Sequence, residues 1–148
     1  MAAKKARDIM TESPAVCTPE TTARDAAQQM ERNDCGSLPV VENRDSMKLI
    51  GIVTDRDLAL RILGRGQDSG TRISEAMTRN VASVKPDDDL DAVEHVMSGQ
   101  QVRRVPVVDD RDRVLGIIAQ ADLARELQSV GTQDFSRVVE KISAPAHT

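Results

Sequence analysis

The apolar positions of this chain follow the same order twice. In each half, apolar residues at helical spacing are followed by two short apolar runs. A constant offset of 67 residues relates Met10 to Met77 and the run ending at Val41 to the run ending at Val108. Beyond these runs the offset falls to 65, because the connecting loop of the first copy is two residues longer. The sequence therefore predicts two copies of one supersecondary unit.

Each copy is predicted to contain an amphipathic helix. The first helix spans Ala23 to Arg32, and its apolar face consists of Ala23, Ala26, Ala27 and Met30. The apolar face of the sister helix consists of Leu90, Val93, Val96 and Met97. A proline and a polar run precede each helix, and acidic groups are favourable near a helix N-terminus.

Two short apolar runs follow each of these helices and are typical of β-hairpins. The predicted strands are Leu38–Val41, Leu49–Val53, Val105–Val108 and Val114–Ile118. A second, shorter helix is then expected from about Asp55 to Leu63 and from about Gln120 to Leu127. The repeated unit is therefore β-α-β-β-α, and the predicted fold class is α+β.

The predicted domains are residues 1–66 for the first repeat, 67–131 for the second, and 132–148 for a C-terminal helical tail. Residues 64–74 contain three glycines between polar residues and are expected to form the linker. In the tail, an apolar face would comprise Phe135, Val138, Val139 and Ile142. This face would pack either on the protein's own surface or against a second subunit.

Composition argues against several functional classes. The chain has 148 residues and a net charge of −4, with no Trp or Tyr and a single Phe, which disfavours nucleic-acid binding. Its apolar runs are far shorter than the roughly 20 residues that span a bilayer, so no membrane association is expected. No signal peptide is recognisable, and a cytoplasmic location is expected.

The cysteines and histidines suggest no catalytic or metal site. Cys17 and Cys35 align with Val84 and Val102, so both are expected to be small buried hydrophobic residues. Together with the two histidines they match no metal-ligand spacing. Neither histidine has a nucleophile or an orienting carboxylate at a recognisable spacing, and we expect no enzyme activity.

Candidate chemistry lies where the second strand of each hairpin enters its short helix. In the first copy, Thr54 and Asp57 have the spacing of a helix capping box. The second copy has Ala119 and Asp122, so it keeps the carboxylate and loses the hydroxyl. A carboxylate at such a turn also suits a ribose diol, while a hydroxyl and a helix N-terminus suit phosphate. Both interpretations, a helix cap and a nucleotide site, remain open at this point.

The duplicated runs Leu38–Val41 and Val105–Val108, followed by the run Gly-hydrophobic-hydrophobic-Thr-x-x-Asp, resemble a tandem pair of CBS domains, the Bateman module. In the second copy Ala119 replaces the Thr of this run. The resemblance covers about residues 6–128 and is strongest to small stand-alone bacterial proteins of the family, including the mycobacterial hypoxic response proteins. It implies two repeats packed through their sheets as an α/β-type sandwich with pseudo-twofold symmetry. It also implies a disc-like homodimer.

The resemblance further implies that clefts between the repeats bind adenine-containing regulatory ligands. AMP, ADP, ATP, NADH and S-adenosylmethionine are the expected candidates, with no obligatory cofactor. Binding would signal through a conformational or oligomeric change, as in energy sensing or a stress response, to a protein partner that the sequence does not name. The alternative is a ligand-free structural or stress-associated dimer that acts through protein partners.

Carried over residue by residue, the resemblance implies two unequal sites. In the first, Asp57 would bind the ribose and Thr54 a phosphate, with Val81, Val102 and Arg103 around the base.

In the second site, Asp122 would bind the ribose and Arg104 a phosphate, since a guanidinium is a strong phosphate partner. The residues expected near its base are Pro14, Cys35 and Gly36. Ala119 stands where the family usually has Ser or Thr, so this site has no hydroxyl at that position. Ser37 occupies the position of Arg104 in the first copy, so the first site has no arginine there.

Overall fold

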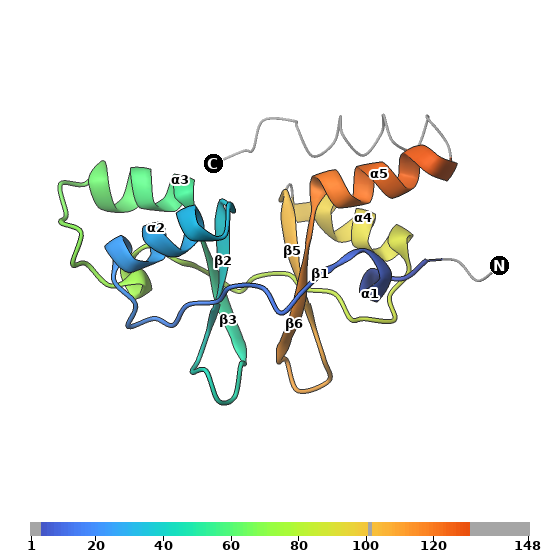
Figure 1. Cartoon of the computed structure of the whole chain (residues 1–148), viewed down its shortest axis with the longest axis horizontal. Helices are drawn as coiled ribbons and strands as arrows, with labels where there is room; N and C mark the ends of the chain where they lie inside the picture. Colours follow the sequence, from blue (N-terminus) through green and yellow to red (C-terminus); the bar gives the residue numbers. More distant parts are fainter. Residues whose placement is uncertain (1–3, 101, 131–148) are drawn as a thin grey trace. The chain divides into compact units, whose positions relative to one another are not determined.

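The chain forms two compact units in the computed structural model, which describes residues 4–100 and 102–130 (Figure 1). The first-repeat unit contains residues 13–81 and 111–114. The second-repeat unit contains the described residues up to Glu12, residues 82–110 and the described residues from Leu115 onward. The tail predicted for residues 132–148 lies outside the described residues.

The first-repeat unit is built around a three-stranded sheet in the order β2-β3-β4. Its elements are α2 (Ala23–Arg32), β2 (Ser37–Val41), β3 (Leu49–Thr54), α3 (Asp55–Asp57), η1 (Leu58–Leu63), η2 (Ile73–Glu75) and β4 (Thr78–Arg79). β3 pairs antiparallel with both of its neighbours. The predicted hairpin and the predicted bounds of the first helix are confirmed.

The second-repeat unit repeats this arrangement with a sheet in the order β1-β6-β5. Its elements are α1 (Ala6–Ile9), β1 (Thr11–Glu12), α4 (Leu90–Gln100), β5 (Arg104–Val108), β6 (Val114–Ala119) and α5 (Gln120–Val130). The mixed α and β class is confirmed. The opening strand of the predicted β-α-β-β-α order, which precedes the amphipathic helix, is represented in each repeat by one parallel bridge, Cys17 with Val40 and Val84 with Val107.

The beginning of each repeat joins the unit built by the other repeat. We call residues 5–12 and 72–79, which correspond at the offset of 67, the incoming segments. Ala6 N–H donates to the Asp88 carbonyl at 2.8 Å, and its counterpart Ile73 donates to the Thr21 carbonyl at 2.8 Å. Ala6 and Ile73 are both fully buried. The sequence repeats and the compact units therefore differ by an exchange of these segments.

A conserved geometry at one glycine in each unit lets the incoming strand approach. A Cβ atom on Gly51 would lie 2.7 Å from the Thr78 carbonyl oxygen, and one on Gly116 would lie 2.9 Å from that of Thr11. Only a residue without a side chain allows such close approach of another backbone. The glycine that opens each Gly-hydrophobic-hydrophobic motif is thus explained by packing.

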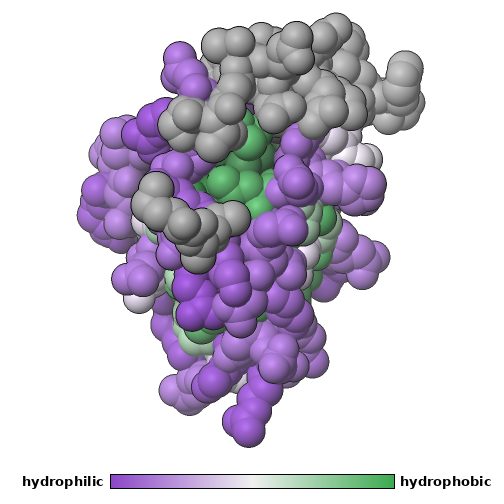
Figure 2. All heavy atoms as spheres, turned by 90° about the vertical axis from the view of Figure 1, so that its right-hand side faces the viewer, coloured by the Kyte–Doolittle hydropathy of each residue, from purple (hydrophilic) through white to green (hydrophobic). Residues whose placement is uncertain are grey.

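Each unit has its own apolar core. In the first-repeat unit the core comprises Cys17, Ala26, Met30, Leu38, Val40, Val53, Ile73 and Met77. In the second-repeat unit it comprises Ala6, Val84, Val93, Met97, Val105, Val107, Ile118, Leu123 and Leu127. On the side shown in Figure 2, the described surface is mostly hydrophilic, with a hydrophobic area near its centre.

Two predictions about individual apolar residues are corrected. Ala27, placed on the apolar face of α2, is exposed, because the buried stripe is narrower and uses Ala23, Ala26 and Met30. Cys17 is buried as predicted, but Cys35 is only half-buried at the edge of the same core. Both cysteines are free thiols.

The helix predicted from Asp55 to Leu63 is not regular. Its first three residues form α3, and Leu58–Leu63 continue as a π-helix in which the Gly64 N–H donates to the Ala59 carbonyl at 2.7 Å. The predicted linker that follows is tied to the start of α2. Ala23 N–H donates to the Thr71 carbonyl at 2.8 Å, which satisfies a backbone group that a helix N-terminus leaves without an internal acceptor.

Candidate functional site

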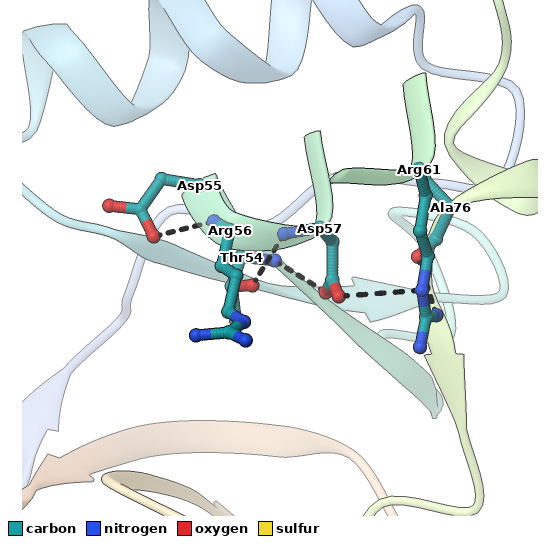
Figure 3. A network of polar contacts seen from close by, with 6 residues as sticks. All are labelled: Thr54, Asp55, Arg56, Asp57, Arg61 and Ala76. Atoms are coloured by element: carbon teal, nitrogen blue, oxygen red, sulfur yellow. Dashed lines mark hydrogen bonds and ion pairs between the residues drawn. The ribbon is translucent and has the colours of Figure 1, made fainter. Parts of the chain in front are cut away.

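The turn from β3 into α3 is organised by the predicted capping box. Thr54 Oγ1 accepts a hydrogen bond from the Asp57 N–H at 3.0 Å, and Asp57 Oδ2 accepts one from the Thr54 N–H at 3.0 Å (Figure 3). Both residues are thereby fixed against the backbone. The Asp57 side chain is 13% exposed, so it is largely but not completely shielded from solvent.

The second carboxylate oxygen of Asp57 faces a cation that the sequence reasoning missed. Arg61 Nε lies 3.9 Å from Asp57 Oδ1, and Arg61 Nη1 donates to the Ala76 carbonyl at 3.1 Å (Figure 3). Arg61 follows Asp57 by four residues, a spacing that brings side chains together on a helix. That spacing was the available signal, and it could have identified Arg61.

The equivalent turn of the second-repeat unit keeps the carboxylate half of the cap. Asp122 Oδ2 accepts from the Ala119 N–H at 3.1 Å, as Asp57 does from Thr54. Asp122 Oδ1 accepts from Arg125 Nη2 at 2.5 Å, and the Asp122 side chain is 20% exposed. The Asp122 carboxylate therefore makes the same backbone hydrogen bond as Asp57, although Ala119 has no hydroxyl. Capping alone accounts for an aspartate in both repeats.

A backbone hydrogen bond joins each turn to the residue that precedes the first hairpin strand. Asp55 N–H donates to the Gly36 carbonyl at 2.9 Å, and Gln120 N–H donates to the Arg103 carbonyl at 2.7 Å. These are corresponding pairs in the two repeats. Gly36 and Arg103, both predicted site residues, are thus held beside the carboxylate turn of their own unit.

Ser37 lies directly across the sheet from Thr54. The two residues are register partners in β2 and β3, so their side chains lie on the same face. Ser37 is 4% exposed, and its Oγ has no hydrogen-bond partner among the residues that the structure describes. A buried hydroxyl without a partner is a donor and acceptor available to a ligand or to water.

The other predicted site residues divide between the two units. The first-repeat unit holds Pro14, Cys35, Gly36, Ser37, Thr54, Asp57 and Val81. The second-repeat unit holds Val102, Arg103, Arg104 and Asp122. Within the first unit, the structure brings Ser37, Thr54 and Asp57 together. Within the second, Arg104 is half-buried at the start of β5 and Arg103 is exposed before it.

Among the described residues, the chemistry of the site is that of hydroxyls, carboxylates and guanidinium groups. No three His, Cys, Asp or Glu side chains in residues 4–100 and 102–130 are grouped to hold a metal ion. His95 is exposed on α4.

Burial raises the pKa of the Cys17 thiol to about 12, with the positive charge of Arg44 acting in the opposite direction. None of the described helices is both long enough and apolar enough to cross a membrane.

Comparison with known proteins identifies relatives of the whole described region. The model of one family, the CBS domain, matches residues 6–64 and 73–129. Hypoxic response protein 1 of Mycobacterium tuberculosis is 33% identical over 135 residues, which cover 90% of this chain and 92% of that protein.

Two solved structures are similar in both fold and sequence. Hypoxic Response Protein I, crystallised with two coordinated zinc ions, has a TM-score of 0.75 at 34% identity, and the match covers 82% of this chain and 98% of that chain. The CBS domain pair of protein MJ0100, in complex with 5′-methylthioadenosine and S-adenosyl-L-methionine, has a TM-score of 0.77 at 30% identity. That match covers 88% of this chain and 100% of that chain.

Proposed function

The chain belongs to the CBS domain family, with two tandem copies of the domain, and from this premise we propose that it is a regulatory protein that binds an adenosyl ligand. The observation that carries the proposal is the buried Ser37 hydroxyl, which has no hydrogen-bond partner among the described residues and lies opposite Thr54, beside the carboxylate turn of Asp57. The ligands of the MJ0100 domain pair, an adenosyl thioether and an adenosyl sulfonium, support the choice of ligand class. Catalysis is not part of the proposal.

Asp57 is the proposed ribose ligand of the first site. Its Oδ2 already accepts from the Thr54 N–H and its Oδ1 faces Arg61, but a carboxylate offers about four lone-pair positions. The remaining positions suit the two donors of a ribose diol. The Thr54 hydroxyl uses one lone pair for the Asp57 N–H and keeps its own proton to donate, which suits a phosphate or carboxylate oxygen of the ligand.

The two proposed sites differ in charge. On the first-repeat side, Ser37 and Thr54 offer two hydroxyls on one face, whereas the second repeat has Ala119 and the half-buried Arg104 at the corresponding positions. A guanidinium favours a phosphate over a neutral group. The second site is therefore the proposed phosphate-selective one, and Asp122 is its proposed ribose ligand. Val81, Val102, Arg103, Pro14, Cys35 and Gly36 remain the proposed residues around the adenine bases.

The proposed output is a change in conformation or in a homodimer. Leu60 and Leu63 are 55% and 76% exposed on η1, whereas the second repeat has Arg125 and Gln128 at the matching positions. Two exposed leucines three residues apart favour a protein contact over a fully solvated helix. A cytoplasmic location and action through a further protein partner complete the proposal.

Ligand binding tests the proposal directly. The panel is AMP, ADP, ATP, NADH, S-adenosylmethionine and 5′-methylthioadenosine, measured by isothermal titration and by melts followed with circular dichroism. A ligand at one hundred times its dissociation constant should stabilise the fold by about 2.7 kcal/mol per site. Asp57→Asn should weaken binding at the first site at least about tenfold, equivalent to one charge-assisted hydrogen bond.

Asp55→Asn is the matched control, because it removes the same charge from the same turn. Asp55 is exposed, and in the network of Figure 3 its side chain accepts a hydrogen bond from the neighbouring Arg56 N–H. Its affinity should equal that of the wild type. A panel without binding at millimolar concentration would overturn the proposal and favour the second candidate, a ligand-free structural dimer. The observation that favours this candidate is that helix capping alone accounts for both aspartates.

A further inference from the structure

We propose that Arg61 is a positioning residue that links the Asp57 carboxylate to the incoming segment of its unit, residues 72–79. Ligand contact at Asp57 would then be transmitted to that segment through one guanidinium. The inference deepens the proposed function and rests on it for the identity of the ligand, whereas the two contacts of Arg61 are seen in the structure itself.

Arg61 contacts two groups that are far apart in the sequence. Its Nε lies 3.9 Å from Asp57 Oδ1, and its Nη1 donates to the Ala76 carbonyl at 3.1 Å, as Figure 3 shows. The Asp57 side chain is 13% exposed and that of Arg61 is 40% exposed. The guanidinium is planar and has several donors in a fixed geometry, so it can hold a carboxylate and a carbonyl at the same time.

Ala76 lies at the centre of the incoming segment. It is fully buried, and it follows η2, whose Ile73 is also fully buried in the unit's core. Two residues further on, β4 pairs with β3 through Thr78 and Ile52. The segment then leads to Val81, a proposed base-contacting residue, so a displacement at Ala76 would be passed along a short and well-anchored stretch of chain.

The second repeat shows what happens without this link. At the offset of 65, Glu126 stands in the place of Arg61. Its Oε2 lies 2.8 Å from Lys4 Nζ, and Lys4 directly precedes residues 5–12, the incoming segment of the second-repeat unit. The residue at this helix position thus contacts the entering chain in both units. Because Glu126 and Asp122 carry the same charge, they do not attract each other, and Asp122 pairs with Arg125 instead. A single side chain that contacts both the carboxylate and the entering chain is therefore described in the first repeat, where it is Arg61.

Hydrogen–deuterium exchange of the full chain, read by mass spectrometry on peptides that cover residues 72–79, tests the link without ligand. Arg61→Ala and Asp57→Asn should each raise exchange there roughly two- to fivefold, the range expected for one partly exposed ion pair. The double variant should exceed the larger single effect by little, since both changes break the same connection. If the two substitutions caused independent structural defects, their fold increases in exchange would multiply in the double variant.

Arg56→Ala is the matched control. It removes an arginine from the same turn, and in Figure 3 the Arg56 guanidinium points away from Asp57. Exchange of residues 72–79 should remain that of the wild type in this variant. Arg61→Lys, which keeps the charge but not the planar fork, should restore protection only in part. If Arg61→Ala changes exchange no more than Arg56→Ala, or if the effects of Arg61→Ala and Asp57→Asn multiply, the inference is wrong.

The ligand arm uses S-adenosylmethionine and AMP as probes. Binding should slow exchange of residues 72–79 in the wild type, and Arg61→Ala should abolish that slowing while changing the affinity less than about threefold. Binding by the variant with the slowing intact would overturn the inference and leave the proposed function standing. If neither probe binds the wild type, adenosyl binding by these two ligands fails, whereas the ligand-free comparison still decides the link.

Discussion

Substitution of Gly51 by alanine tests whether the incoming strand is held as tightly as the structure indicates. The new Cβ atom would lie 2.7 Å from the Thr78 carbonyl oxygen and 3.3 Å from Met77 Sδ. Ordinary van der Waals contact begins at 3.4 Å, so the backbone of β4 must retreat by about 0.7 Å. That movement would strain the pairing of Gly51 with Arg79 and of Ile52 with Thr78.

The expected cost follows from two opposing terms. Forcing an extra methyl group into a packed site costs about 1–3 kcal/mol. Replacing glycine in a strand recovers about 0.5–1 kcal/mol, because glycine loses more backbone freedom on folding than alanine does. With both terms at their midpoints, Gly51→Ala should reduce the free energy of unfolding by about 1 kcal/mol. A chain of this length loses about 4 °C in melting midpoint for each kcal/mol.

Urea unfolding followed by far-ultraviolet circular dichroism is the suitable assay, since the chain has no Trp or Tyr for intrinsic fluorescence. Gly116→Ala should also destabilise, because its Cβ would lie 2.9 Å from the Thr11 carbonyl oxygen. Gly99→Ala is the control of opposite sign. Gly99 lies in α4 with nothing within 4 Å of an added Cβ, so alanine there should stabilise by up to about 1 kcal/mol. A Gly51→Ala protein as stable as the wild type would refute the close packing of β3 and β4.

Three further predictions concern the cap, a buried thiol and the exposed leucines. Asp57→Ala should lower the free energy of unfolding by about 1 kcal/mol, whereas Asp57→Asn, which keeps an acceptor for the Thr54 N–H, should cost less in the same urea assay. Burial raises the Cys17 pKa from 9.0 to about 12, so between these values the folded state holds a proton that the unfolded state releases. The free energy of unfolding relative to Cys17→Val should therefore be constant below pH 9 and fall from pH 9 towards pH 12, as measured by urea unfolding at each pH. Leu60→Arg combined with Leu63→Gln, which installs the residues of the second repeat, should convert a dimer to a monomer in light scattering without lowering the melting midpoint; an unchanged mass would contradict the proposed contact.

Local periodicity was sufficient to predict the regular elements. The helix predicted from Ala23 to Arg32 has those bounds in the structure, and both hairpins form where the short apolar runs predicted them. Ala27 was assigned to the wrong face because alanine is tolerated on either side of a helix, and only tertiary packing decides which positions are covered. The π-helical turns of Leu58–Leu63 likewise have no distinct signature in side-chain spacing.

The exchange of incoming segments could not be read from the sequence for a specific reason. The two segments are similar, with Met-Thr at Met10–Thr11 and at Met77–Thr78, and each could pair locally with the strand of either repeat. The choice depends on contacts between residues far apart in the chain, such as Ala6 with Asp88. Repetition, which made the fold recognisable, is also what left this pairing undetermined.

The site was predictable in part, because the capping spacing of Thr54 and Asp57 fixes their mutual geometry through the backbone. Arg61 was not predicted because it lies outside the capping motif, and its side chain returns from the next turn of the helix to reach Asp57 and Ala76. The roles proposed for Val81, Val102 and Arg104 depend on a ligand and remain predictions.

The two aspartates show why the presence of a residue type does not by itself assign a ligand site. Each carboxylate caps its helix whether or not a hydroxyl accompanies it, so capping would retain an aspartate in both repeats even in a protein that binds nothing. Ligand binding requires more than the cap does: a ribose diol needs two acceptor oxygens, whereas the Thr54 N–H needs one. Replacement by asparagine separates these requirements, because one amide oxygen can serve the cap and the amide NH₂ cannot accept from the ribose. If Asp57→Asn weakens ligand binding and leaves the stability of the protein nearly unchanged, the carboxylate is a ligand-binding group. If ligand affinity and protein stability change only with Asp57→Ala, the carboxylate acts as a helix cap.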